Sequence, residues 1–148
     1  MAPCPDVYVR LPHLDRLRLE SFLDAHVTSW RESAAWLSED ASDILRAGLS
    51  GSPSGETLYA SPSSGVRDTG LSFVMLALPR DSGVVLGVSV DLEPDEDAAM
   101  TMAEKWLVRL MRELGAPQGF VQAEEPPPLT EAEWQVEMAR ALSSRSGS

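Results

Sequence analysis

A chain of 148 residues with 43% hydrophobic side chains has the size of one ordinary domain and enough apolar material for a buried core. Its formal net charge of −11 argues against nucleic-acid binding through the phosphate backbone, because that mode of binding needs a basic surface. The longest apolar run, 73–79, is far too short to span a membrane, and the single cysteine, Cys4, cannot form an internal disulfide. With no signal-peptide pattern at the N-terminus and many more arginines than lysines, we expect a cytoplasmic bacterial protein.

The first part of the chain predicts two helices between two short strands. Residues 6–11 alternate apolar and polar side chains, as a half-buried strand does. In residues 13–27, one helical face carries Leu19, Phe22, Leu23 and Val27. A second helix is expected to begin after Ser38 or Asp40, since either residue can serve as an N-cap. Residues 56–60 are interpreted as a short strand within a loop that is rich in Ser, Gly and Pro.

The strongest structural signal is a hairpin in the middle of the chain. Two apolar, strand-forming runs, 71–78 and 84–91, enclose a connection that contains Pro, Asp and Gly. Because nearly every position in both runs is apolar, we expect central strands that are covered on both faces by the protein, or on one face by the protein and on the other by a partner.

The last part of the chain predicts a long helix, a strand and a final helix. Residues 95–114 carry an apolar stripe at helical spacing, and residues 119–123 form a short strand-like run. The sequence Thr130-Glu-Ala-Glu133 matches the capping box that begins many helices. The final helix is expected to give way to a disordered tail at 143–148.

These elements predict an α+β fold. We expect one domain over 1–142, with a mainly antiparallel sheet of about four or five strands, the hairpin at its centre, and three or four helices packed on the sheet.

Motifs for catalysis or cofactor binding are not found in the sequence. The closest approach to a nucleophile elbow, 87–91, ends in Asp where the motif needs Gly. His13 and His26 are separated by about 20 Å of helix, so they cannot share a metal ion. A surface or capping role is favoured for each over a role with a distant carboxylate. The acids of 91–97 alternate like those of a calcium loop but lack its Gly and final Glu, which favours a helix start over a weak cation site. We therefore expect no cofactor and no metal, and a non-enzymatic function is favoured over an enzymatic one.

The negative charge is concentrated in the second half of the chain. Residues 91–133 hold 11 acids and three bases, a net charge of −8, which would attract a basic partner. The predicted partner-binding residues are Asp91, Glu93, Asp95, Glu96, Asp97, Glu124 and Glu125, together with Trp30 and Trp36. Trp106 is expected in the core, and Trp134 either anchors the last helix on the sheet or protrudes toward a partner.

The leading hypothesis is a non-enzymatic bacterial protein-binding module with an acidic face, and a toxin-neutralising immunity protein is its most concrete version. The alternative is a small-ligand-binding protein or enzyme with a pocket between the sheet and the helices. The polar lining of that pocket would come from Tyr59, Ser72, Arg80, Ser89 and Asp91. A homodimer that uses the helix at 95–114, or an exposed sheet edge, is a third possibility.

Overall fold

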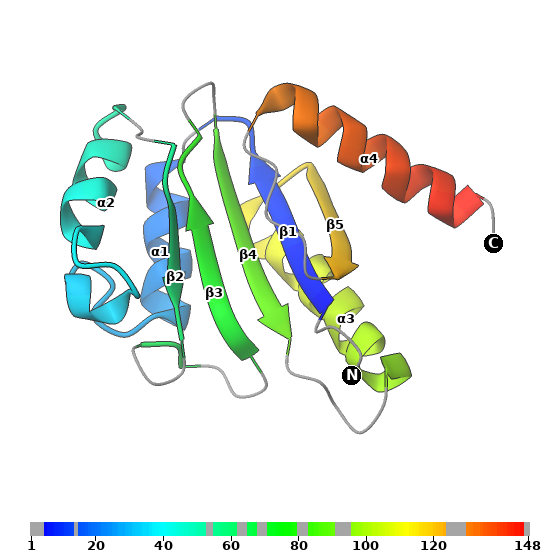
Figure 1. Ribbon diagram of the computed structural model, residues 1–148, viewed down its shortest axis with the longest axis horizontal. Helices are drawn as coiled ribbons and strands as arrows, with labels where there is room; N and C mark the ends of the chain where they lie inside the picture. Colours follow the sequence, from blue (N-terminus) through cyan, green and yellow to red (C-terminus); the bar gives the residue numbers. More distant parts are fainter. Residues whose placement is uncertain are drawn as a thin grey trace.

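One five-stranded antiparallel sheet organises the computed structural model, with the strand order β2-β3-β4-β1-β5 (Figure 1). The strands are β1 (Pro5–Leu11), β2 (Thr57–Ala60), β3 (Leu71–Ala77), β4 (Val84–Val90) and β5 (Gln118–Ala123). The structure describes residues 5–13, 15–52, 55–61, 65–67, 71–79, 83–90, 96–123 and 130–146. The predicted α+β class is confirmed, and the hairpin β3–β4 lies inside the sheet as expected.

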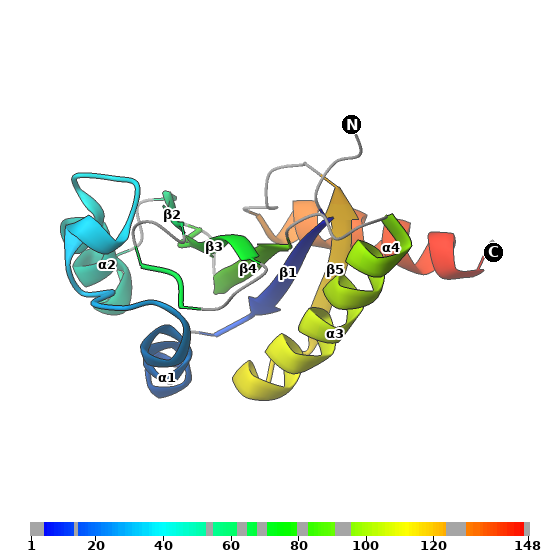
Figure 2. The same cartoon turned by 90° about the horizontal axis from the view of Figure 1, so that it is seen from below.

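Four α-helices and one short 3-10 turn accompany the sheet. They are α1 (Arg16–His26), the turn η1 (Ser33–Ala35), α2 (Ala41–Leu49), α3 (Glu96–Leu114) and α4 (Glu131–Ser146). Helices α1 and α3 lie side by side on one face of the sheet, and α2 lies next to the edge strand β2 (Figure 2). Side chains of α4 pack on the other face.

Alternation along the strands produces two apolar layers. Val7, Val9 and Leu11 of β1 point into the main core beneath α1 and α3. Tyr8, between them, points to the opposite face and joins a second, smaller cluster. The second cluster consists of Tyr8, Met75, Ala77, Val85, Phe120 and Trp134, with Met138 packed against it. Both faces of the central strands are therefore covered, as their continuous apolar sequence predicts.

Trp134 anchors α4 on this second face. Its indole is 1% exposed and meets the Phe120 ring edge-on, with 5.1 Å between ring centroids. The buried Arg10 of β1 forms an ion pair with Glu131 in the first turn of α4. Of the two positions that the sequence allowed for Trp134, the anchoring one is confirmed.

The central strand β1 is paired on both sides. Tyr8 lies opposite Gly87 of β4 and opposite Phe120 of β5. A Cβ atom at Gly87 would be 2.7 Å from the Tyr8 ring, so the glycine provides the space that the ring occupies.

The helix ends follow their local sequence. Asp15 caps α1 by accepting a hydrogen bond from the Arg18 backbone N–H at 3.1 Å, which is why the helix begins after His13. Thr130 Oγ1 accepts from the Glu133 N–H at 3.1 Å, as the capping box predicts. Helix α4 continues to Ser146, whereas the sequence predicts a disordered tail from residue 143.

Candidate functional site

Most of the predicted acidic site follows the strands β4 and β5 directly in the chain. Asp91, Glu93, Asp95, Glu124 and Glu125 lie outside the described residues. Glu96 begins α3, and Asp97, in the first turn of the same helix, is exposed. The structure does show where the chain enters these two acidic segments, because β4 ends at Val90 and β5 ends at Ala123.

The sheet brings these two strand ends together. Both β4 and β5 run antiparallel to β1, so they run in the same direction and end at the same end of the sheet. Ser89 and Gln122 both pair with Asp6, which puts the two ends level on either side of β1. At the usual strand spacing, two strands separated by one neighbour are about 10 Å apart. Val90 and Ala123, which are 33 positions apart in sequence, therefore end their strands at the same end of the sheet.

Asp6 adds a further acid to this end of the sheet. It lies on the central strand, between the two strand ends, and is nearly buried. Burial, and then the negative charge of Asp6, raises the pKa of the Tyr59 hydroxyl above its ordinary value.

One flank of α3 carries both acidic and apolar side chains. Met100, Glu104 and Val108 follow each other at intervals of four residues, so they form a row along the helix, and all three are exposed. Trp106 and Glu113 face the opposite way, toward His26 of α1. The row therefore lies on the side of α3 that is turned away from α1.

His26 and Glu113 form a polar link between α1 and α3 inside the apolar layer. His26 Nε2 and Glu113 Oε2 are 3.0 Å apart, and the buried imidazole lies between the rings of Phe22 and Trp106. The expectation of a surface or capping histidine is therefore wrong for His26, although His13 is exposed. No local pattern indicates this pair, because its members are 87 positions apart.

The carboxyl group of Glu113 is held in its charged form. Burial raises the pKa of this carboxyl, but hydrogen bonds from Arg109 and His26, and the charges of both residues, outweigh burial. The pKa of Glu113 therefore lies below its ordinary value. Arg109 Nε donates to Glu113 Oε1 at 2.8 Å and is the stronger of the two donors. Both oxygens of the Glu113 carboxylate already accept hydrogen bonds. The pair of His26 and Glu113 therefore links the two helices and is a poor candidate for proton transfer.

Trp30 and Trp36 are core residues. Each indole is only 3% exposed, which corrects the expectation that the pair contacts a partner. Trp30 Nε1 donates to Asp24 Oδ1 at 2.6 Å, and Trp36 Nε1 donates to the Trp30 carbonyl oxygen at 2.7 Å. Both polar atoms are satisfied inside the protein, so the indoles fix the connection between α1 and α2.

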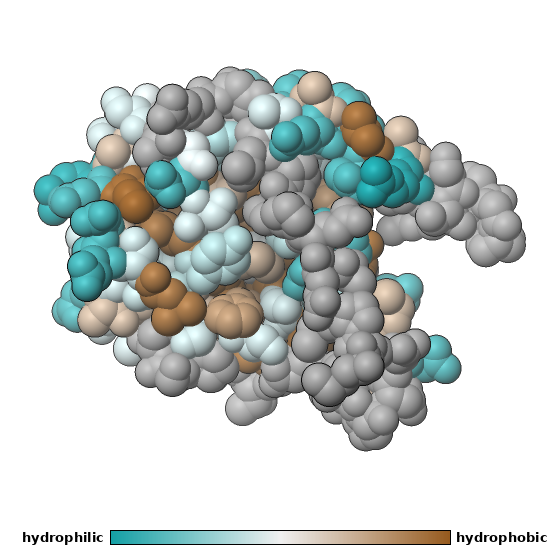
Figure 3. All heavy atoms as spheres, in the orientation of Figure 1, coloured by the Kyte–Doolittle hydropathy of each residue, from teal (hydrophilic) through white to brown (hydrophobic). Residues whose placement is uncertain are grey.

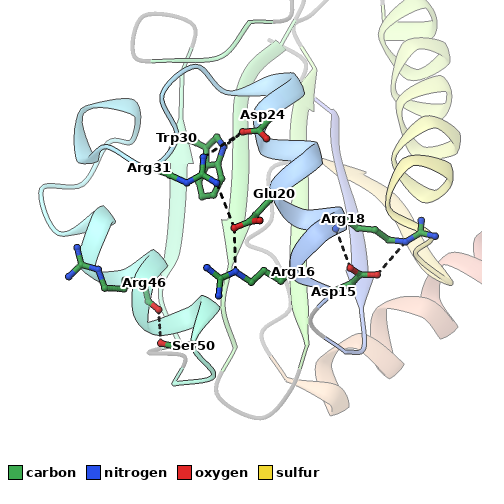
Figure 4. A network of polar contacts seen from close by, with 9 residues as sticks. All are labelled: Asp15, Arg16, Arg18, Glu20, Asp24, Trp30, Arg31, Arg46 and Ser50. Carbon is green, nitrogen blue, oxygen red and sulfur yellow. Dashed lines mark hydrogen bonds and ion pairs between the residues drawn. The ribbon is translucent and has the colours of Figure 1, made fainter.

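A cleft of about 330 Å³ opens between α1 and α2. The described residues that line it are Arg16, Glu20, Trp30, Arg31, Ser42, Leu45, Arg46, Leu49 and Ser50. Arg16 and Arg31 converge on Glu20, whereas the guanidinium of Arg46 extends away from them along α2 (Figure 4). The sequence offered no signal for this cleft, because its arginines come from three separate segments.

The polar lining predicted for a ligand pocket does not meet in this cleft. Tyr59 lies on the second face of the sheet, where its ring meets Phe73 edge-on with 6.3 Å between centroids. Ser89 is nearly buried in β4, and Ser72 lies in β3, while Arg80 and Asp91 fall outside the described residues. Figure 3 shows apolar surface, in tan and brown, on the part of this face over β2 and β3.

Comparison of the chain with protein-family models, with curated proteins and with solved structures finds no match. Within the described ranges, no group of three or more His, Cys, Asp or Glu side chains is arranged to hold a metal ion. The helices in that part of the chain are all too short or too polar to cross a membrane.

Proposed function

We propose that this protein is a non-enzymatic bacterial module of the cytoplasm that binds a basic protein through its acidic face. The acidic face comprises the acids that follow β4 and β5 and the adjoining flank of α3. A toxin-neutralising immunity protein is the most concrete form of this function. The observation that supports the proposal is the common end of β4 and β5, since the chain continues from both strands into acidic sequence.

Charge and shape both favour a protein partner over a small cation. The segment 91–133 has a net charge of −8, and such a field accelerates encounter with a basic surface by roughly 10- to 1,000-fold. Protein interfaces combine an apolar centre with a polar rim. The row of Met100, Glu104 and Val108 on α3 supplies exposed apolar surface beside acids.

The test is capture of a partner from the native host by the full chain at low and high salt. One variant neutralises the acidic face at Glu93, Asp95, Glu96, Glu124 and Glu125 with Gln or Asn. A matched control neutralises five exposed acids of the first half, namely Glu32, Glu39, Asp40, Asp43 and Glu56. We expect a basic protein that is captured by wild type and control, is released by salt, and is lost from the first variant. Capture that is equal in all three proteins and insensitive to salt would refute the proposal.

A homodimer is the competing use of the same surface. The edge strand β5 and the exposed row on α3 lie on the same side of the molecule, and a second copy could cover both. Two copies would bring like charges together, which opposes association. Native mass measurement at low salt distinguishes the two, since the proposal expects a monomer and a stable dimer contradicts it.

A further inference from the structure

We propose that the cleft between α1 and α2 binds a small organic phosphate, with the phosphate group on Arg16 and Arg31 and the organic part against Leu45 and Leu49. This site is separate from the acidic face and does not depend on the function proposed above. It would give the protein a small-molecule ligand in addition to any protein partner.

The first argument is the concentration of arginines. Among the described lining residues there are three arginines and one acid, Glu20, in a chain that has far fewer bases than acids. Two acids just outside this lining, Asp24 and Asp43, pair with Arg31 and Arg46, so carboxylates balance the charge of the arginines. The cleft therefore supplies guanidinium donors to an anion and does not supply an excess of positive charge.

The second argument is that the two central guanidiniums are already held together. Glu20 Oε1 lies 3.3 Å from Arg16 Nε and 3.7 Å from Arg31 Nη2, so a single anionic oxygen contacts both (Figure 4). Asp24 also pairs with Arg31, so two carboxylates accompany these two guanidiniums. Arg16 comes from α1 and Arg31 from the segment after it, so the two approach the cleft from different directions.

Arg31 is further fixed by an aromatic platform. Its Cζ atom lies 4.0 Å from the centroid of the Trp30 ring, and its Nη1 is 3.8 Å from Asp24. Trp30 cannot move freely because it is buried and bonded to Asp24 at 2.6 Å. A side chain that is held in this way loses less conformational entropy when a ligand binds.

The third argument is the kind of hydrogen bond that the cleft can offer. Ser42 Oγ donates to the Arg31 carbonyl oxygen at 3.1 Å, and Ser50 Oγ donates to the Arg46 carbonyl oxygen at 2.7 Å, so both hydroxyl protons are engaged. The hydrogen-bond donors that remain for a ligand belong to guanidinium groups. Arg16, for example, uses only its Nε in the described ion pairs, which leaves its two Nη groups. Guanidinium groups bind phosphate and carboxylate oxygens through paired, charge-assisted hydrogen bonds.

Size and shape select an organic phosphate from these anions. Two guanidiniums that approach from different directions suit the tetrahedral oxygens of a phosphate better than the planar oxygens of a carboxylate. The cavity of 330 Å³ falls at the lower end of the range of about 300–1,000 Å³ that is typical of small-ligand sites. That volume exceeds what one phosphate group fills, and Leu45, Leu49 and Trp30 provide apolar wall for the remainder.

The experiment is calorimetric titration of the full chain at constant ionic strength with phenyl phosphate, inorganic phosphate and phthalate. We expect saturable binding of one phenyl phosphate per chain, tighter than that of inorganic phosphate or phthalate. Arg16→Gln and Arg31→Gln should each weaken phenyl phosphate binding by roughly tenfold, because each removes a charge-assisted contact. The control is Arg18→Gln, which changes the net charge equally on the same helix but lies outside the cleft, and it should bind like wild type.

Several results would overturn the assignment. The side chains of Arg16 and Arg31 are 60% and 64% exposed, so neither variant should unfold, and circular dichroism verifies this. Equal weakening by all three variants would mean a general charge effect. Tighter binding of phthalate would assign a carboxylate ligand instead, and absence of saturable phenyl phosphate binding at millimolar concentration would remove the site. Phenyl phosphate binding by the variant neutralised on the acidic face should be unchanged, which separates this test from that of the proposed function.

Discussion

Replacing Trp134 with Ala tests whether α4 is held on the second face of the sheet by one side chain. The indole is almost fully buried against Phe120 and Tyr8. A buried aromatic side chain removes about 150–250 Å² from water, which at about 25 cal/mol per Å² corresponds to about 4–6 kcal/mol. Measured losses for comparable truncations are about 3–5 kcal/mol. We therefore expect Trp134→Ala to lower the free energy of unfolding by about 3 kcal/mol or more.

The loss has a physical ceiling, because α4 can detach without unfolding the rest of the sheet. Its other described anchors are Met138 and the ion pair between Glu131 and Arg10. If α4 detaches more easily than the whole protein unfolds, the loss in the free energy of unfolding cannot exceed the free energy with which α4 docks on the sheet. Amide hydrogen exchange then shows α4 unprotected while α3 stays protected.

The assay is urea unfolding followed by circular dichroism, together with hydrogen exchange. Val136→Ala is the matched control, since this residue lies two positions further along α4 and is 57% exposed. The control should change the free energy of unfolding by no more than about 0.5 kcal/mol. If Trp134→Ala loses less than about 1 kcal/mol and the exchange of α4 is unchanged, the anchoring role is refuted.

Three further changes test other parts of the structure. Gly87→Ala should cost about 1–3 kcal/mol in urea unfolding, because the new Cβ meets the Tyr8 ring at 2.7 Å. The penalty should be smaller in a Tyr8→Leu background, where only the contact with the Val7 carbonyl oxygen at 3.0 Å remains. Glu113→Gln should lower stability at neutral pH by no more than about 1 kcal/mol, since the carboxylate is about one-third exposed and screened by solvent. The folded-state pKa of Glu113 is lowered, so its contribution is present above the unfolded-state pKa and is lost as the pH falls through the folded-state pKa. Unfolding curves of variant and wild type should therefore converge in acid, and a constant difference at all pH values would contradict this. Asp15→Ala should cost about 1 kcal/mol through loss of the N-cap of α1, and an unchanged melting temperature would show that the cap contributes nothing.

Elements that depend on neighbouring residues could be predicted from the sequence. The hairpin was located within one residue at each strand, because its apolar runs and turn residues are local signals. The capping box at Thr130 and the stop after Leu114 were equally local, and Gly115 indeed adopts a positive φ of 64° there.

Features that depend on tertiary packing could not be predicted. Trp30 and Trp36 lie in a stretch without helical or strand periodicity, so nothing in the sequence indicated that the packing of α1 and α2 would bury them. The contact of His26 with Glu113, and the convergence of Arg16 with Arg31, likewise depend on how separate segments meet in space. Local pattern carries no information about such pairs.

The position of β1 between β4 and β5 has a consequence for folding during synthesis. Its two neighbours, β4 and β5, are made long after it during synthesis, since Tyr8 pairs with residues 87 and 120. Pairings across such sequence separations require closure of long loops and form slowly. A nascent chain that has not yet reached residue 123 holds β1 with one side unpaired. Early termination in this protein therefore turns β1, an interior strand of the complete sheet, into an exposed edge, and shortened products should be prone to aggregation and degradation.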